Sequence, residues 1–229
     1  QQEYRAQHDK GEIIMWALLN SDNTINKILT RPKALTIGDV NYPANIFSMW
    51  TSVELEALKI YEVVIDNTNF KDEHYYINTD QTFAFASGAV TASFGTATGK
   101  LIADTLYTSS EVAADVHEVG HAKAGQRINT WVEGDVKTRG LKYSHKVAIN
   151  EGAAGQLQST DWMVVRATEG GTAVPSATTT WRAAVRTKAN AMCTAIDGAA
   201  DVDALAALYV YNSDSPPVRP LGDFPVLGA

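Results

Sequence analysis

Apolar and polar positions in the first hundred residues alternate in short runs that are separated by turn-forming residues. Residues 16–19 are apolar, and the mixed run 25–29 follows a polar stretch at 21–24 that contains Asp22 and Asn23. Asp and Asn bond their own local backbone and tolerate left-handed angles, so this pattern predicts a hairpin. β-Favouring runs with turn residues between them predict further strands over residues 61–65, 75–77, 82–85 and 90–94.

A helix is expected within this β-rich half. Thr51 is placed to cap a short helix that runs through Ile60, with Val53, Leu55 and Leu58 available for burial. A further turn is indicated at residues 37–40. We therefore expect an antiparallel β-module with one short helix over residues 15–99.

After residue 99 the strand signals fade and helix-favouring residues continue to the end of the chain. Thr108 and Glu111 carry capping-box chemistry, which predicts the start of a helix that continues through residues 117–121. Further helices are predicted over residues 142–158, 181–196 and 202–208. Within the second of these, near-heptad spacing predicts a packing face made of Val185, Ala189, Met192 and Ile196.

These patterns predict an α+β chain with distinct parts. A helical hairpin or small bundle is expected over residues 100–212, after the β-module at 15–99. Residues 213–229 are rich in Pro and Gly and are expected to be a tail, either disordered or laid on a neighbour. Residues 1–11 are polar and charged, and Met15 is a more natural beginning, so we expect residues 1–14 to be an upstream leader outside the fold.

The composition narrows the classes of function. Nineteen basic and 26 acidic residues give a formal charge of −7, which opposes attraction to phosphate backbones and anionic lipid, so we expect no nucleic-acid and no membrane partner. No apolar run approaches the roughly 20 residues of a membrane span. The single cysteine, Cys193, cannot form an intramolecular disulfide, which fits a reducing cytoplasm. Phosphate-binding loops and a Gly-x-Ser-x-Gly motif are absent from the sequence.

Residues near the C-terminus carry a resemblance to a known class of proteins. The stretches 161–166 (Asp-Trp-Met-Val-Val-Arg), 169–175 and 181–186 (Trp-Arg-Ala-Ala-Val-Arg), together with 195–201 and 205–209, resemble a helical segment of tailed-bacteriophage tail proteins. The resemblance covers about the last third of the chain and is closest to tail-fibre assembly families, including those of marine phages. It implies a structural or assembly role and no catalytic residue.

An alternative comes from the sequence His117-Glu118-Val119-Gly120-His121, the His-Glu-x-x-His signature of zinc peptidases. On a helix, residues i and i+4 share a face, so His117 and His121 would bind Zn²⁺ while Glu118 activates a bound water. Glu151, in an Asn-Glu-Gly segment, is the candidate third ligand, with Glu133 and His145 behind it.

Two features weigh against zinc. Val112, Val116 and Val119 would occupy one side of the helix, so that both histidines point to the opposite, solvent side. Glu151 also follows His121 by more residues than is usual for a Glu-type peptidase, and it lies within the phage-like helical region.

The favoured expectation is therefore a non-enzymatic phage tail protein without a cofactor, which binds other tail, fibre or baseplate proteins. Whether it is a virion component or a cytoplasmic assembly chaperone stays open, as does homo-oligomerisation. The residues expected to pack the helices or contact a partner are Trp162, Arg166, Trp181, Arg182 and Arg186.

Overall fold

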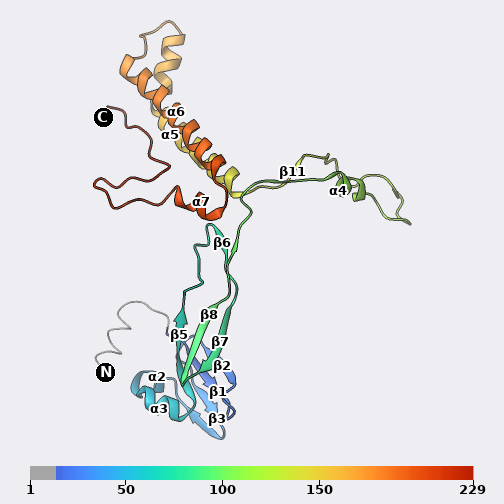
Figure 1. Ribbon diagram of the computed structural model, residues 1–229, viewed down its shortest axis with the longest axis vertical. Coiled ribbons are helices and arrows are strands. Elements are labelled where there is room, and N and C mark those ends of the chain that lie inside the picture. Colours follow the sequence, from blue (N-terminus) through green and yellow to red (C-terminus); the bar gives the residue numbers. More distant parts are fainter. Residues whose placement is uncertain (1–13, 229) are drawn as a thin grey trace. The chain divides into compact units, whose positions relative to one another are not determined.

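The computed structural model describes residues 14–228 and confirms the α+β class, with strands dominating the N-terminal half and helices the C-terminal half (Figure 1). The chain forms two compact units, the first comprising residues up to 73 together with 77–98 and the second comprising 74–76 together with 99 onward. The expected leader lies outside the described residues except for Ile14, which packs against the first unit. Among residues 14–228, no helix combines the length and the apolar character needed to cross a bilayer.

The first unit is built on a five-stranded sheet with the order β2-β1-β5-β8-β7. The predicted hairpin is present: β1 (Trp16–Leu19) pairs antiparallel with β2 (Ile25–Leu29). Asp22 closes its turn, because its carboxylate accepts the Thr24 amide at 2.9 Å, and Asn23 adopts a φ of 66°. The other predicted strands form β5 (Ile60–Asp66), β7 (Gln81–Ala86) and β8 (Ala89–Phe94).

The expectation of a wholly antiparallel module is wrong at one pairing. β5 and β8 run parallel, with Val63 opposite Val90, while β7 and β8 form the antiparallel hairpin. Alternation within each strand indicates which face is buried but carries no information on the direction of a distant partner. The helix capped by Thr51 is present as α3 (Ser52–Ala57), with both capping-box bonds formed. A second short helix, α2 (Ile46–Met49), was not predicted.

Each face of this sheet buries its own set of side chains. Met15, Ala17 and Leu19 of the β1 region lie on one face with Val63 and Val90. On the opposite face, Trp16, Leu29 and Ile60 pack against Ile46, Phe47 and Leu55 of the short helices. Smaller pairings complete the strands: β3 (Leu35–Ile37) with β4 (Val40–Tyr42), and β6 (Tyr76–Ile77) with β9 (Thr98–Gly99).

The second unit is centred on two long helices, α5 (Leu141–Thr168) and α6 (Ser176–Gly198), which pack against each other as a hairpin. Both extend beyond their predicted ranges. The predicted packing face is confirmed, because Val185, Ala189, Met192 and Ile196 are all buried. The predicted short helix is α7 (Val202–Ala207), which contributes Leu205 to the same core.

The C-terminal tail packs on the helices of its own unit through residues 221–225. It forms no helix or strand in its described part, as its composition predicts. Leu221 is nonetheless 2% exposed and belongs to the core of the hairpin. Trp181 donates its indole N–H to the carbonyl of Pro225 at 2.8 Å. The tail was expected to be disordered or laid on a neighbour, and it instead covers this chain's own core because it supplies apolar side chains and a carbonyl acceptor there.

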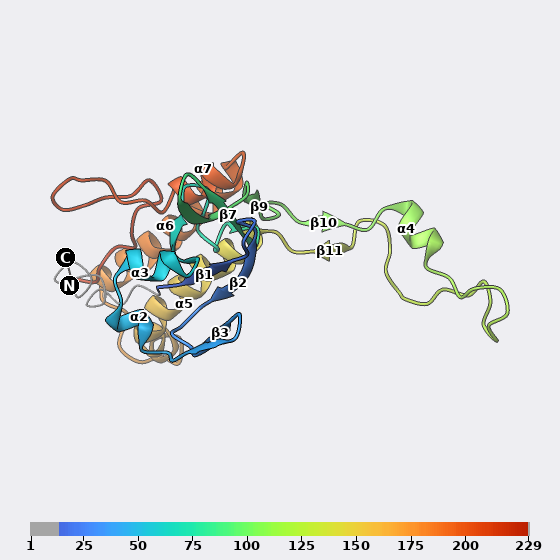
Figure 2. The same cartoon turned by 90° about the horizontal axis from the view of Figure 1, so that it is seen from below.

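The helical region also contains a segment with strands that the sequence did not predict. Strands β10 (Thr105–Leu106) and β11 (Val136–Thr138) pair antiparallel, and between them lie α4 (Ser109–Ala114) and a long loop. The two strands run side by side with α4 and the loop beyond them (Figure 2). We call residues 101–139 the arm.

Candidate functional site

The arm is held together by local polar bonds. Thr108 caps α4 and accepts the Glu111 amide, while the Glu111 carboxylate accepts the Thr108 amide at 2.9 Å. Glu111 also pairs with Lys137 of β11. The ammonium group of Lys137 is the largest cause of a fall in the Glu111 pKa to about 2, followed by the bonds to Thr108. These contacts tie α4 to the opposite strand of the arm.

Aromatic and amide groups cross-link the arm further along its length. The rings of Tyr107 and Trp131 stack with centroids 4.3 Å apart and an interplanar angle of 14°. Asp115 accepts the Asn129 backbone amide at 2.8 Å and its side-chain amide at 3.0 Å. Tyr107 and Trp131 were not predicted as site residues, because they lie far apart in the sequence and outside regular helices and strands.

No residue of the arm is buried, although many are apolar. Val119, at 102% exposure, protrudes fully into solvent. A segment that orders its backbone while burying little apolar surface gains little from the main favourable term of folding. The other large apolar side chains that the arm exposes are Leu101, Leu106, Ile128, Val132 and Val136.

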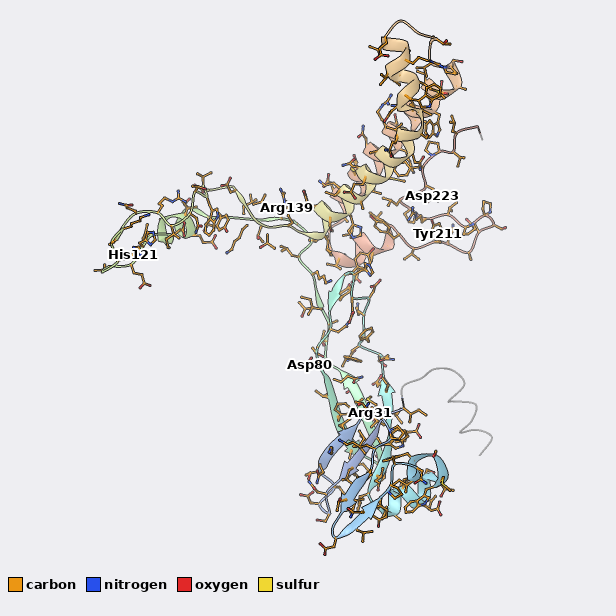
Figure 3. All side chains as sticks on the ribbon, turned by 180° about the vertical axis from the view of Figure 1, so that it is seen from behind. Arg31, Asp80, His121, Arg139, Tyr211 and Asp223 are labelled. Carbon is orange, nitrogen blue, oxygen red and sulfur yellow. The ribbon has the colours of Figure 1, made fainter. Side chains whose placement is uncertain are left out.

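The His-Glu-x-x-His segment lies in the loop of the arm and is not helical, contrary to the prediction. α4 ends at Ala114, because Asp115 turns away to bond Asn129. The chain then bends at Gly120, which has a φ of 98°. Figure 3 labels His121 at one end of the arm and Arg139 at the other.

His117 and His121 still lie together, although not through helical spacing. Their rings stack with centroids 4.2 Å apart and 7° between planes. The Lys123 backbone N–H donates to His121 Nδ1 at 3.1 Å, so a neutral His121 carries its proton on Nε2. The nitrogen lone pairs of two stacked, nearly parallel rings point in parallel directions. Two histidines that bind the same metal ion need lone pairs that converge on it.

The structure does not assemble the remaining residues of a zinc site. Glu151 and His145 lie on α5, whereas Glu118 and Glu133 lie in the loop of the arm. Within residues 14–228 there is no group of three or more His, Cys, Asp or Glu side chains with the spacing to hold a metal ion. The residues present do not fit the zinc-peptidase arrangement.

His145 instead belongs to an aromatic cluster at the first turns of α5. Its Nδ1 lies 2.7 Å from the Tyr209 hydroxyl, and its ring stacks on Tyr75 at 5.7 Å. Burial, and secondarily the charge of His74, lowers the pKa of His145 from its ordinary value of 6.5. Burial likewise raises the pKa of Tyr209 to about 12. The cluster therefore favours the neutral forms of His145 and Tyr209, and its rings pack against the helical hairpin.

The five candidate interaction residues divide into packed and exposed side chains. Trp181 is 9% exposed and lies in the core, while Trp162 is 54% exposed. Arg182 is fixed, because it pairs with Asp161 at 2.7 Å and donates to Thr160 at 2.6 Å. Arg166 stacks its guanidinium group over Trp162 at 4.9 Å. Arg186 is exposed, and it forms no hydrogen bond or ion pair with the described residues.

Comparisons with protein-family models, curated proteins and solved structures found no match for the chain.

Proposed function

We propose that this chain is a bacteriophage tail-associated structural or tail-fibre assembly protein that acts by protein–protein binding, with the arm as its main binding element. The observation that carries the proposal is that none of residues 101–139 is buried, while six large apolar side chains are exposed along them. The resemblance of the C-terminal segment to phage tail proteins supplies the class of partner, namely other tail, fibre or baseplate proteins. Its location would be the virion tail, or the host cytoplasm during assembly.

Physical reasons favour binding as the role of the arm. Ordering a backbone costs roughly 1–2 kcal/mol per residue, and a two-stranded ribbon alone is only marginally stable in water. Covering exposed apolar side chains returns about 25 cal/mol per Å². A partner that covers the arm provides this term, and the −7 charge of the chain limits association with other acidic surfaces.

Removing the arm tests the proposal without disturbing the hairpin. Thr105 and Thr138 are antiparallel partners, so a two-residue Asn-Gly turn in place of residues 106–137 joins them directly. The base of the arm is kept, because Asp104 still pairs with Arg139 and still accepts the Gly140 amide at 2.8 Å. Helical circular dichroism checks that α5 and α6 still form.

Co-expression with the other tail genes of the same phage, followed by size-exclusion chromatography, gives the readout. We expect the unaltered chain to co-elute with a tail protein and the arm-replaced chain to elute alone. The double substitution Val119→Ser and Ile128→Ser should weaken the complex, whereas Val226→Ser, at a 72% exposed position outside the arm, should leave it unchanged. A complex that forms equally well without the arm contradicts the proposal.

The alternative function is that of a zinc metallopeptidase, and the observation that favours it is the proximity of His117 and His121. Elemental mass spectrometry of the purified protein after dialysis against a weak chelator separates the two functions. Our proposal expects negligible zinc. About one zinc per chain, with peptide hydrolysis that is lost on Glu118→Ala, would replace it with the enzymatic function.

A further inference from the structure

A second surface on the same unit lies along α6. A groove of about 280 Å³ is lined by apolar and basic side chains from α5, from α6 and from the segment between them. Its lining residues are Val164, Val174, Thr179, Arg182 and Arg186. This surface shares no residue with the arm.

The two arginines of the groove differ in how they are used. Arg182 is 12% exposed in its side chain and is bonded to the Leu157 carbonyl, Thr160 and Asp161. Arg186 lies one turn further along α6 and keeps its guanidinium donors unused by the described residues. Since Asp161 neutralises one of the two charges, the groove keeps a net positive charge in a chain of charge −7.

Apolar side chains are exposed in the groove and on the adjoining turns of α5. Val164 is 39% exposed, and its neighbours Trp162 and Val165 are each 54% exposed. Arg166 covers part of the Trp162 ring. A guanidinium group with unused donors beside exposed aliphatic surface matches a ligand that carries a carboxylate next to an apolar group.

We infer that this groove binds an acidic segment of a partner protein, in which an Asp or Glu carboxylate pairs with Arg186 and an adjacent apolar side chain contacts Val164 and Val174. The planar guanidinium group presents two parallel N–H donors that suit a carboxylate. The inference rests on the proposed function, because it assigns a second contact to a protein that acts by binding.

The test uses two blocked dipeptides that differ in charge alone, N-acetyl-leucyl-glutamate amide and N-acetyl-leucyl-glutamine amide, titrated into the full chain. Backbone amide shifts of Val164, Val174 and Thr179 are followed by NMR. We expect the glutamate peptide to shift them saturably in the millimolar range and the glutamine peptide to bind about tenfold more weakly.

Substitutions of single arginines test whether the peptide binds at the groove. Arg186→Ala should weaken binding of the glutamate peptide about tenfold, to the level of the glutamine peptide, and Arg186→Lys should retain part of the affinity. Arg31→Ala removes an exposed arginine of the first unit and should change nothing. Equal binding of the two peptides, unaltered binding by Arg186→Ala, or the absence of saturable shifts would overturn the inference.

The outcome is separable from that of the proposed function. The arm-replaced chain keeps the groove, so it should bind the glutamate peptide as the unaltered chain does. If the chain forms an arm-dependent complex but does not bind the glutamate peptide, only the inference about the groove is contradicted. If the chain binds the glutamate peptide but forms no arm-dependent complex, only the proposed role of the arm is contradicted.

Discussion

The arm and the helical hairpin belong to one unit and are stabilised in opposite ways. The hairpin buries a continuous row of apolar side chains between α5, α6 and the tail. The arm has no residue in the buried class, and it is held by a capping box, an ion pair and two stacked rings that are only partly buried. The difference predicts that the hairpin is the more stable of the two regions and that the arm opens more readily.

Proteolysis should separate the two regions by the largest factor. Trypsin sites at Lys123 and Arg127 lie in the exposed loop of the arm, and sites at Arg182 and Lys188 lie on α6. Cleavage in α6 requires global unfolding, so we expect the arm sites to be cut on the order of a thousandfold faster. A mass-spectrometric time course measures the cleavage rates at both sets of sites. Comparable rates would show that the arm and the hairpin do not differ in stability.

The same substitution placed in each region should differ by several kcal/mol. Ile196 is 0% exposed and Ile128 is 54% exposed. Ile196→Ala should lower the free energy of unfolding by about 2–5 kcal/mol, because it removes buried methyl groups and leaves a cavity. Ile128→Ala should change it by less than about 0.5 kcal/mol. Urea unfolding followed by helical circular dichroism measures both, and an equal loss would show that the arm has a core.

Glycine substitutions probe the junction where the arm meets α5. A Cβ on Gly140 would lie 2.4 Å from the Ala103 carbonyl carbon, whereas a Cβ on Gly155, inside α5, meets nothing within 4 Å. Gly140→Ala should destabilise the protein by about 1–3 kcal/mol through steric overlap with backbone. Gly155→Ala should stabilise it by about 0.5–1 kcal/mol through helix propensity. The thermal midpoints should therefore move in opposite directions, and a shared direction would contradict the packing at Gly140.

Acid should loosen the two regions in different pH windows, with the smallest effects. The pKa of His145 is lowered by burial, so the unfolded chain binds more protons below pH 6.5, and hairpin stability should fall as pH drops from 6.5 through the folded-state pKa. The pKa of Glu111 is about 2 in the fold and ordinarily 4.5, so its contribution to the arm is full above pH 4.5 and is lost towards pH 2.

Amide exchange of α5 and α4 across this pH range is the measurement. His145→Gln should remove the decline in α5 below pH 6.5 and leave α4 unaffected. Simultaneous loosening of both helices near one pH would contradict the separate titrations.

The parts that the sequence predicted correctly are those with a local apolar pattern. The spacing of Val185, Ala189, Met192 and Ile196 was enough to identify the buried face of α6, and the Thr51 cap placed α3. The direction of the β5 and β8 pairing depends on contacts between distant residues and left no local signal.

Candidate functional residues were harder to place than the core. The capping box at Thr108 correctly marked the start of α4, but the helix did not continue into His117, because no apolar face there is buried and Asp115 bonds Asn129 instead. Local spacing therefore predicted a helix through His117 and His121 that the fold does not contain. The exposed state of Trp162 and the unused donors of Arg186 depend on tertiary packing, which the pattern alone does not specify.

Amide hydrogen exchange of the arm, in the free chain and in the complex isolated by co-expression, is the decisive test of the proposal that the chain binds through the arm. We predict that amides of residues 105–138 exchange rapidly in the free chain and slow by about a hundredfold or more in the complex, while those of α6 are protected in both states. Rapid exchange throughout the arm in a formed complex would show that the partner binds elsewhere and that the arm is not the binding element.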